Sequence, residues 1–551
     1  MAATRVPELP EVLPVKAQCL PYAQIPHTSR LFLDFLSDFP KVQQFYSSSP
    51  YSSEWQKPTR RPYDPERRAR VSDILERQNR AWGASEKTIV NIARLRGGAS
   101  AALTGQQVGL FGGPLFALYK ALSAVKLAEQ ATAAGVDCVP VFWLATNDHD
   151  LAEVNHTNFP GPGGTPQLVT VPSYGVEDAP VGTIQFGDEI TGVVEAAAEL
   201  LGDSPVTEML RESYRAGENF GSAFARLFAR LFADWGVILL DPCDPELQAI
   251  AAPIYKAAIE RAAEIDDALL ERGKALERAG YHQQVKVTPS STLLFTLHEG
   301  ARIPVHRRVN GQSMEFLAGD RKLTQAELLG QIAAAPHQFS PNVLLRPIVQ
   351  DYLLPTQVYT GGTAEVAYFA QVAVVYERLL GQVTPILPRF SATLVETKVQ
   401  GLLERYGLTL TDVFAGEEAL REKIASRILP PELQSAFDRA GANLEQSLAA
   451  IRKALVQLDK TLAEAADNAG SKMQHQLESL RGRAARAELR QTEIVGRHAQ
   501  MLSASLYPNK TLQEREIAGV AYLARHGTDL LRELYATVHT DCHDHQVITL
   551  S

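Results

Sequence analysis

Short runs of apolar residues alternate with amphipathic helical stretches over the first two thirds of the chain. Residues 101–104, 139–144 and 237–240 form runs without polar alternation, a pattern typical of strands buried on both faces of a parallel sheet. Residues 114–128 follow the first run with apolar positions at helical spacing, and the amphipathic residues 224–235 precede the third. Strands that alternate with helices predict a doubly wound α/β core.

Two irregular regions interrupt this predicted core. Residues 158–180 are rich in glycine and proline, which predicts an insertion that leaves the sheet. Residues 281–316 are expected to form short antiparallel strands at 293–297 and 303–305, and Pro304 limits the second strand to the edge of a sheet. The core sheet is predicted to resume near Val343 and to finish with 383–387. The resulting boundaries place the core at 1–157, 216–280 and 336–395, with connecting insertions at 158–215 and 281–335.

A coiled-coil pattern replaces the α/β pattern in the last third. Apolar residues recur in alternating steps of four and three at Leu444, Leu448, Ile451, Leu455, Leu458, Leu462 and Ala465, the spacing of an a/d seam. A turn-like cluster at 467–471 precedes a second helical segment, so the pattern predicts a hairpin that folds back at Gly470. The hairpin is either a dimerisation arm or packed on its own domain, because an a/d seam can be satisfied in both ways. The helical domain is placed at 396–510, and a C-terminal helix with a closing strand at 511–551.

Composition narrows the class of protein. The chain has 551 residues, of which 45% are apolar, enough for a large core with an appended domain. Its formal net charge of −9 gives no sign of a basic surface for nucleic acid. Residues 1–26 are broken by prolines and lack the apolar stretch of a signal peptide, and no later stretch is long and apolar enough to span a membrane. We therefore expect a cytoplasmic protein without nucleic-acid or membrane partners.

The cysteines and the C-terminal histidines suggest no metal site or disulfide framework. Cys19, Cys138, Cys243 and Cys542 lie far apart without a CxxC pair, which argues against a zinc ribbon and for buried or incidental thiols. Residues 538–545 are rich in metal-ligand types but have no defined ligand spacing. No metal ligand is therefore assigned.

The strongest chemical signal is the glycine-rich segment 104–114, which lies between a predicted strand and a predicted helix. Glycines let the backbone approach an anion closely, and a helix N-terminus offers free N–H groups. The alternative is a plain tight turn. The ligand contacts assigned to the segment are Gly105, Gln106, Gln107, Gly109, Gly112 and Gly113. Lys120, about two turns into the helix, is either a further contact or a solvated surface lysine.

A second signal follows the strand predicted at 139–144. Ligands in open α/β sheets bind beyond the carboxyl ends of the strands. His149, flanked by Asp148 and Asp150, is a candidate general base, and the same carboxylates are candidate Mg²⁺ ligands. In the structural alternative, Asp148 or Asp150 caps the next helix.

Two further turns complete the candidate site. Gly361 and Gly362 precede a helix whose first turn carries Glu365, which either favours the helix dipole or holds a substrate amine. Arg389 and Ser391 close the last predicted strand and suit a phosphate or a carboxylate. The alternative is a surface arginine with a capping hydroxyl.

In their order along the chain these motifs resemble the BshC family, whose enzymes add cysteine in bacillithiol synthesis. The resemblance covers nearly the whole sequence and rests on Ile25-Pro26 with 31–34, 105–114, 141–143 with 148–150 and Glu153, Tyr281-His282, 339–347 with Gln350, Asp351, Leu354 and Pro355, and Pro388-Arg389. Asn342 and Arg346 belong to the most specific of these motifs and join the candidate ligand contacts through it. Thr363 departs from the proline that the family often has there, but the turn keeps its glycines and Glu365.

The resemblance implies a Rossmann-like core related to class I synthetases and nucleotidyltransferases. It also implies two connecting-peptide insertions and a coiled coil that makes a homodimer. The implied reaction is the last step of bacillithiol synthesis, in which L-cysteine forms an amide with the glucosamine amine of glucosaminyl-malate.

Amide formation from a free carboxylate needs activation, and ATP with Mg²⁺ is the expected donor, through an acyl-adenylate or an acyl-phosphate. The sequence has no GK[ST] phosphate-loop motif, so this expectation rests on thermodynamic need and the family. The hypothesis assigns phosphate or malate binding to 105–113 and Arg389, amine deprotonation to His149, and amino-group binding to Glu365. Two other interpretations stay open: a nucleotidyltransferase for another amino acid or sugar, and a catalytically inactive coiled-coil scaffold.

Overall fold

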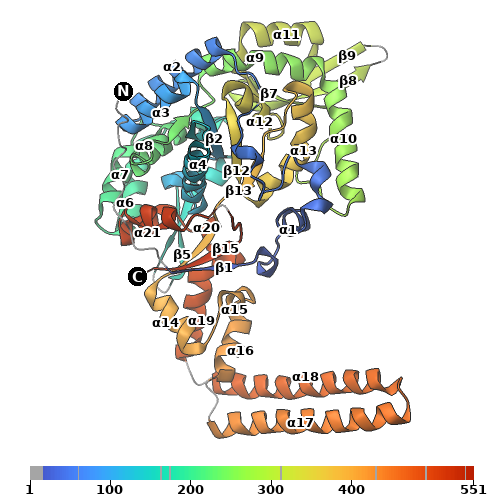
Figure 1. The fold of residues 1–551 in the computed structure, drawn as a ribbon. Helices are drawn as coiled ribbons and strands as arrows, with labels where there is room; N and C mark the ends of the chain where they lie inside the picture. The colour runs from blue at the N-terminus through green and yellow to red at the C-terminus, as the bar shows by residue number, and fades with distance from the viewer. Residues whose placement is uncertain are drawn as a thin grey trace. The chain divides into compact units, whose positions relative to one another are not determined.

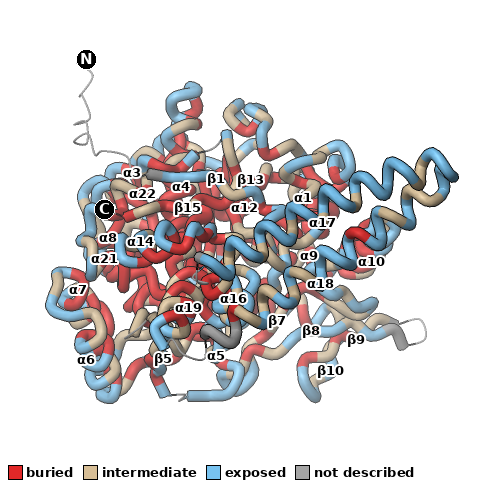
Figure 2. Tube along the Cα trace, turned by 90° about the horizontal axis from the view of Figure 1, so that it is seen from below, coloured by how far each residue is buried: buried red, intermediate tan, exposed pale blue. Residues whose placement is uncertain are grey.

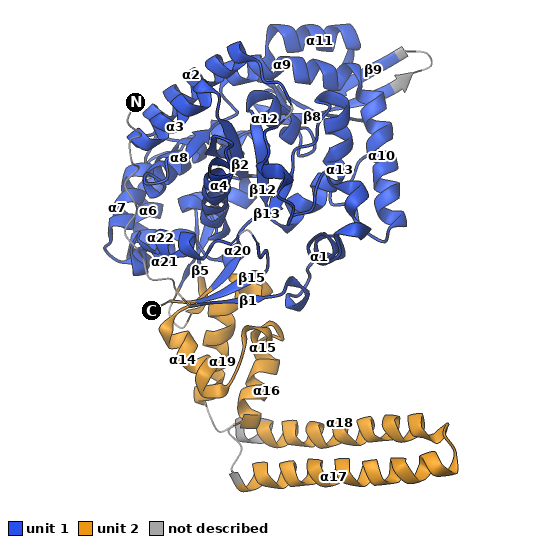
Figure 3. Cartoon of the chain, viewed as in Figure 1, with its two compact units in different colours: residues 1–160, 167–393, 514–548 blue, residues 161–166, 394–513, 549–551 orange. Residues whose placement is uncertain are grey.

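The computed structural model describes residues 16–59, 61–161, 164–172, 175–310, 313–427, 431–489, 493–539 and 541–550. They fall into two compact units (Figure 3). Unit 1 comprises Met1–Pro160, Gln167–Thr393 and Glu514–Ile548, and unit 2 comprises Gly161–Pro166, Leu394–Gln513 and Thr549–Ser551. Within the described ranges, none of the helices combines the length and the apolar character that a membrane crossing needs.

The centre of unit 1 is a five-stranded parallel sheet in the order β13-β12-β2-β3-β6 (Figure 1). Its strands are β2 (Ser100–Gln106), β3 (Cys138–Leu144), β6 (Ile238–Leu240), β12 (Thr356–Gly361) and β13 (Ile386–Pro388). Every residue of β3 and β12 is buried, and Figure 2 shows that the buried segments gather in the interior. The predicted doubly wound α/β core is confirmed: the strand order reverses between β2 and β12.

Helices cover this sheet, and the largely buried α4 (Phe116–Ala133) packs against β2, β3 and β12. Its apolar and small side chains extend around nearly the whole helix, as expected for a helix with buried faces on all sides. Helix α8 (Phe220–Leu231) begins four residues before the predicted start, because Asn219 and Ser222 form a capping box. The other helices outside the C-terminal helical region are α1 (Arg30–Ser37), α2 (Pro65–Ala81), α3 (Glu86–Gly97), α5 (Leu151–Val154), α6 (Glu189–Leu201), α7 (Pro205–Ser213), α9 (Pro245–Glu260), α10 (Ala262–Arg278), α11 (Gln325–Ala334), α12 (Arg346–Leu353), α13 (Thr363–Leu379), α20 (Gln513–Glu516), α21 (Gly519–His526) and α22 (Leu530–Thr537).

A second, antiparallel sheet of unit 1 has the order β10-β9-β8-β7-β11. Its strands are β7 (Ser291–His298), β8 (Ala301–Asn310), β9 (Ser313–Ala318), β10 (Arg321–Thr324) and β11 (Phe339–Pro341). The prediction that Pro304 confines its strand to a sheet edge is wrong, since β8 lies between β7 and β9. The ladder to β9 starts at Val305, just beyond the proline. Pro304 therefore has a paired strand on one side, where a missing N–H is tolerated.

The predicted resumption of the core sheet at Val343 is also wrong. Val343 is 40% exposed and lies between β11, which belongs to the antiparallel sheet, and α12. The core resumes after α12, at Thr356. The final core strand is Ile386–Pro388, so it includes only the end of the predicted 383–387 segment.

The remaining short strands form two small sheets. Strands β4 (His156–Pro160) and β5 (Pro166–Thr170) pair with each other, and a small sheet has the order β1-β15-β14. Its strands are β1 (Lys16–Leu20), β14 (Ala392–Val395) and β15 (His545–Thr549). The predicted closing strand at the C-terminus is therefore present, and it pairs with a strand from the start of the chain.

Unit 2 is helical. Its helices are α14 (Thr397–Tyr406), α15 (Leu410–Phe414), α16 (Glu417–Arg427), α17 (Pro431–Leu458), α18 (Leu462–Leu489) and α19 (Glu493–Leu506). Helices α17 and α18 form the predicted hairpin, and Figure 2 shows that their surfaces are mostly exposed.

The hairpin turns at 459–461 and not at Gly470 as predicted. The Asp459 carboxylate accepts hydrogen bonds from the backbone N–H and the hydroxyl of Thr461, both at 2.8 Å, which stabilises the turn. Gly470 lies inside α18, where a Cβ would approach the Leu448 side chain to 3.2 Å. Gly470 thus allows α17 and α18 to pack closely.

Candidate functional site

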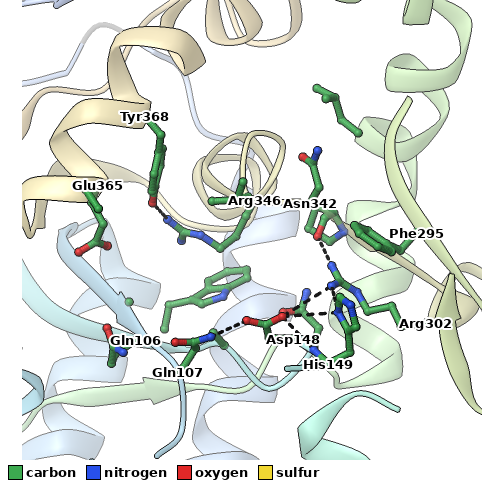
Figure 4. A pocket seen from close by; sticks show the side chains of 18 of the residues that line it. Gln106, Gln107, Asp148, His149, Phe295, Arg302, Asn342, Arg346, Glu365 and Tyr368 are labelled. Atoms are coloured by element: carbon green, nitrogen blue, oxygen red, sulfur yellow. Dashed lines mark hydrogen bonds and ion pairs between the residues drawn. The ribbon is translucent and has the colours of Figure 1, made fainter. Parts of the chain in front are cut away.

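A cavity of about 620 Å³ opens at the carboxyl ends of β2, β3 and β12, where the strand order of the parallel sheet reverses. This is the position at which open α/β sheets bind ligands. Strands β7 and β8 and the segment 341–346 form the opposite wall (Figure 4). Of the residues assigned from the sequence, the cavity is lined by Gly105, Gln106, Gln107, Asp148, His149, Asn342, Arg346, Gly362, Glu365 and Arg389.

A buried ion pair between Lys120 and Glu365 joins the ends of β2 and β12. Lys120 Nζ lies 2.5 Å from Glu365 Oε2 and donates to the Gly105 carbonyl at 2.7 Å and to Gln106 Oε1 at 2.8 Å. The surface alternative for Lys120 is therefore wrong: the residue is 4% exposed. Burial lowers the pKa of Lys120 to about 8 although Glu365 opposes the shift. All three protons of the ammonium group have acceptors, so this lysine holds the two strand ends together.

The Glu365 carboxylate is also held by hydrogen bonds from Tyr359 and Gly362. Burial acts to raise its pKa, but Lys120, the Tyr359 hydroxyl and the Gly362 N–H hold the pKa below its usual value. The Tyr359 hydroxyl donates to Oε1 at 2.5 Å and the Gly362 N–H donates to Oε2 at 2.7 Å. Gly361 lies outside the cavity lining, and a Cβ there would come within 2.7 Å of the Glu365 Cβ. Gly361 therefore leaves space for the carboxylate side chain.

Arg346 and Asn342 both reach the cavity from the start of α12. The Asn342 side chain accepts hydrogen bonds from the N–H groups of Leu344 and Leu345, both at 3.0 Å, and so fixes the start of the helix. Arg346 donates to the Tyr368 hydroxyl at 2.9 Å and to the Tyr359 hydroxyl at 3.2 Å. The two tyrosines thus connect this arginine to the turn that carries Glu365.

His149 lies between Asp148 and an arginine that sequence reasoning did not assign. Arg302 Nη1 is 2.9 Å from His149 Nδ1, and Asp148 Oδ1 is 3.6 Å from the same nitrogen. A guanidinium group only donates, so Nδ1 accepts this hydrogen bond and the neutral imidazole carries its proton on Nε2. The Phe295 ring lies 3.8 Å below the Arg302 guanidinium. Burial lowers the pKa of Arg302 to about 10, which leaves it cationic at neutral pH.

Asp148 and Asp150 point in different directions. Asp148 Oδ2 accepts a hydrogen bond from Gln107 Nε2 at 2.8 Å. Asp150 is not part of the cavity lining and caps α5, where its carboxylate accepts the Glu153 N–H at 3.3 Å. The described residues contain no group of three or more His, Cys, Asp or Glu side chains arranged to hold a metal ion.

The glycines 109, 112 and 113 form a packed turn away from the cavity. Gly112 has φ of +85°, and its N–H donates to the Tyr214 hydroxyl at 3.0 Å. A Cβ on Gly109 would lie 2.9 Å from the Gly113 Cα. The N–H of Leu115, at the start of α4, donates to the Ile517 carbonyl at 2.8 Å. Here the structure differs from the anion-binding interpretation, because these glycines serve close packing and protein groups occupy the N–H donors of Gly112 and Leu115.

Arg389 reaches the cavity, whereas Ser391 does not. The Arg389 guanidinium is buried and pairs with both carboxylate oxygens of Glu514, at 2.5 and 3.2 Å. The Ser391 hydroxyl lies 3.0 Å from Glu514 Oε2 and 2.7 Å from His545 Nδ1, behind the cavity wall. Burial lowers the pKa of His545 to about 4. The assignment of Ser391 to ligand binding is therefore corrected to support of Arg389 and Glu514.

Sequence reasoning missed Arg302 and Glu514 and noted His545 only within the metal-ligand types of 538–545, because each of the three lies more than 120 residues from its partner. It also missed Arg515, which lines the cavity and stacks over Phe116. The cavity lining carries five cationic side chains, Lys120, Arg302, Arg346, Arg389 and Arg515, against two carboxylates, Asp148 and Glu365. In a chain of net charge −9, this local excess of positive charge favours an anionic ligand.

Comparison with known proteins agrees with this architecture. Residues 15–390 match a family described as "Bacillithiol biosynthesis BshC, N-terminal Rossmann-like domain", and residues 392–550 match "Bacillithiol biosynthesis BshC, C-terminal coiled-coil domain". Three relatives carry the name "Putative cysteine ligase BshC". The protein from Koribacter versatilis is 50% identical over 96% of this chain and 99% of its own length. Those from Solibacter usitatus and Salinibacter ruber are 37% and 34% identical, over 97% and 94% of this chain and 99% and 96% of their own lengths. The family resemblance and the Rossmann-like and coiled-coil fold class are thereby confirmed, and the chain belongs to the BshC family of bacillithiol biosynthesis.

Proposed function

We propose that this chain is a ligase that joins the carboxyl group of L-cysteine to the glucosamine amine of glucosaminyl-malate. The observation that carries the proposal is the cationic cavity at the strand-order reversal. The malate part of the acceptor brings two carboxylates and cysteine brings a third, so both substrates suit a lining with five cations and two anions. The relatives' name supports cysteine as one of the substrates.

Arg346, Arg389 and Arg515 are the residues that we assign to anionic groups. Arg515 is exposed at the cavity and stacks over Phe116. The buried Nε–H of Arg389 has no hydrogen-bond partner among the described residues and lies beside Gly362 at the cavity wall. An unpaired buried donor is costly, so a ligand oxygen at this position would satisfy it.

We further propose ATP with Mg²⁺ as the co-substrate, which would activate the cysteine carboxylate as a mixed anhydride with phosphate or AMP. The donor set fits its phosphates, since Arg515 and the Arg389 Nε–H are available to an anion. Asp148 is the described cavity carboxylate that is half-exposed and accessible to a substrate ammonium or a hydrated cation.

The role of His149 depends on which nitrogen carries the proton. With Arg302 bonded to Nδ1, His149 presents an N–H at Nε2 and would orient a substrate oxygen. Proton removal from the substrate amine by Nε2 would require Arg302 to leave Nδ1. A His149→Gln variant keeps an N–H donor, whereas His149→Ala removes it. We expect Gln to retain more turnover than Ala, and equal losses with a changed pH profile would assign the base role instead.

The test of the reaction is mass-spectrometric detection of the cysteine amide from purified protein, L-cysteine and glucosaminyl-malate, with and without ATP·Mg²⁺. We expect product only with ATP. The Arg346→Met variant should lose most of the turnover, while Arg77→Met, which breaks an exposed ion pair with Asp244 and Glu246, should not. No product under any condition would contradict the proposed substrates.

We also propose that the α17–α18 hairpin forms a homodimer. Leu448, Leu455 and Leu462 of the predicted seam are partly buried, but Ile451 and Leu458 remain 53% and 82% exposed. The hairpin therefore covers one half of its a/d seam and leaves the other for a second helix pair. Light scattering should report a dimer for the native chain and a monomer for Ile451→Glu/Leu458→Glu. A monomeric native chain would contradict the proposal.

A further inference from the structure

Two cysteines from opposite ends of the chain face each other in unit 1. Cys19 lies in β1 and Cys542 lies just before β15, and the two sulfur atoms are 3.4 Å apart across a sequence separation of 523 residues. Strands β1 and β15 are hydrogen-bonded neighbours. Cys19 is exposed and Cys542 is partly exposed, so a small reagent can reach the pair.

The other two cysteines differ from this pair. Cys138 is buried in β3, and burial raises its pKa to about 12. Burial also raises the pKa of Cys243 well above its usual value. Among the described residues, neither of these thiols has a second cysteine at hydrogen-bond distance. The sequence expectation of buried or incidental thiols therefore fits Cys138 and Cys243 better than Cys19 and Cys542.

The surroundings of the pair suit a disulfide better than a metal ion. The described residues contain no metal-binding group of His, Cys, Asp and Glu side chains, although Asp541, His543 and Asp544 are sequence neighbours of Cys542. Burial, the Cys542 thiol and the two aspartates raise the pKa of Cys19 to about 11. A thiol of high pKa is a poor leaving group, which slows the reduction of a disulfide that contains Cys19 without preventing it.

Cys542 also lies close to the support of the cavity wall. His545, three residues after Cys542, is hydrogen-bonded through Nδ1 to the Ser391 hydroxyl at 2.7 Å and through Nε2 to the Thr393 hydroxyl at 2.8 Å. Ser391 contacts Glu514, which holds Arg389 at the cavity. A covalent bond at Cys542 would therefore secure the strand that supports this arginine.

We propose that Cys19 and Cys542 form a reversible disulfide that fastens the C-terminal strand β15 to β1 when the thiol pool is oxidised. The oxidant is a low-molecular-weight disulfide, RSSR. One cysteine thiolate attacks RSSR, forms a mixed disulfide and releases one RSH. The second cysteine attacks the protein sulfur of that mixed disulfide and releases the second RSH. Two protein thiols are oxidised and one RSSR is reduced to two RSH, with no other reactant.

The sulfur atoms need to approach from 3.4 Å to the about 2.05 Å of a disulfide, beside the existing pair of strands β1 and β15. The bond would enclose nearly the whole chain in one loop. In the chain-entropy account, stabilisation grows with the length of the loop. The oxidised protein should therefore unfold at a higher temperature than the reduced protein.

The chemical test uses the full chain, reduced and then incubated with oxidised glutathione, alkylated and digested without reduction. We expect one cross-linked peptide pair that joins Cys19 to Cys542, with the loss of two hydrogens, and its disappearance after dithiothreitol. Cys19→Ser and Cys542→Ser should each abolish it, and Cys138→Ala should not. Free alkylation of both thiols, or separate glutathione adducts on each, would overturn the proposal.

The fastening is tested by thermal unfolding. Tm of the native chain should rise on oxidation and return with dithiothreitol, while Tm of Cys19→Ser should not respond. An unchanged or lower Tm of a cross-linked native chain would overturn the fastening role.

A consequence for the enzyme rests on the proposed function. The turnover of cysteine and glucosaminyl-malate should survive heating in oxidised glutathione longer in the native chain than in Cys19→Ser, and an equal loss in both would overturn this consequence. Absence of turnover in the reduced native chain would instead contradict the proposed function, and the cross-link result would stand independently.

Discussion

The turn at 109–113 and the turn at 361–365 both follow a central strand of the parallel sheet and both lead into a long buried helix. The first places its glycines under α8 and Tyr214, outside the cavity lining. The second directs Glu365 into the cavity, where it meets Lys120. Two similar glycine-rich turns thus have different tasks, because the residues packed around each turn decide whether its backbone groups remain available.

The largest loss of stability is expected when the Lys120–Glu365 ion pair, which joins the two strand ends, is removed. Lys120→Met leaves the Glu365 carboxylate buried without its cation, and such a loss costs about 3–5 kcal/mol of unfolding free energy. Denaturant unfolding measures the change, and turnover should fall with it. Lys120→Met/Glu365→Gln should be more stable than Lys120→Met. A single variant as stable as the native chain would show that the pair does not hold the strand ends.

His545, which contacts Ser391 behind Arg389, should make the stability of the fold depend on pH. His545 has a pKa of about 4 in the folded chain, below the about 6.5 of an unfolded histidine. The unfolded state therefore binds the proton first as pH falls, and stability is lost between about pH 6.5 and 4, by roughly 3 kcal/mol in all. Tm measured from pH 7 to 4 should fall less steeply in His545→Gln. Parallel slopes for the two proteins would contradict this account.

Alanine substitutions distinguish the two turns directly. Gly112→Ala forces a side chain into φ of +85° and to within 3.2 Å of Leu227, which we expect to cost about 1–3 kcal/mol of stability with turnover of the folded fraction retained. Gly361→Ala would displace the Glu365 side chain and should reduce turnover more than stability. Thermal unfolding and turnover measured on both variants test this. Loss of turnover in folded Gly112→Ala would restore a ligand-binding role for the first turn.

The smallest effect is expected at the cap of α5. Asp150→Ala removes the carboxylate that accepts the Glu153 N–H, which typically costs about 1 kcal/mol. Turnover should change little, whereas Asp148→Ala should reduce it because Asp148 lines the cavity. Equal losses of turnover in the two variants would return Asp150 to the catalytic group.

Local patterns predicted a large part of this molecule. The apolar runs at 101–104, 139–144 and 237–240 correspond to β2, β3 and β6, because a strand covered on both faces needs an uninterrupted apolar sequence. The heptad spacing predicted the α17–α18 hairpin but placed its turn at Gly470. A glycine favours both a turn and a close helix contact, and the Asp459–Thr461 hydrogen bonds decide between them.

The sequence by itself determined the three central strands β2, β3 and β6, that a coiled coil follows the α/β core, and that Asp148, His149, Arg346 and Glu365 belong to motifs at strand and helix ends. Tertiary structure decided which of these side chains share a cavity. It buried Lys120, brought Arg302 to His149, and set Glu514 between Arg389 and Ser391. The physical reason is range: strand and helix patterns arise from neighbouring residues, whereas burial and charge pairing depend on residues more than a hundred positions away.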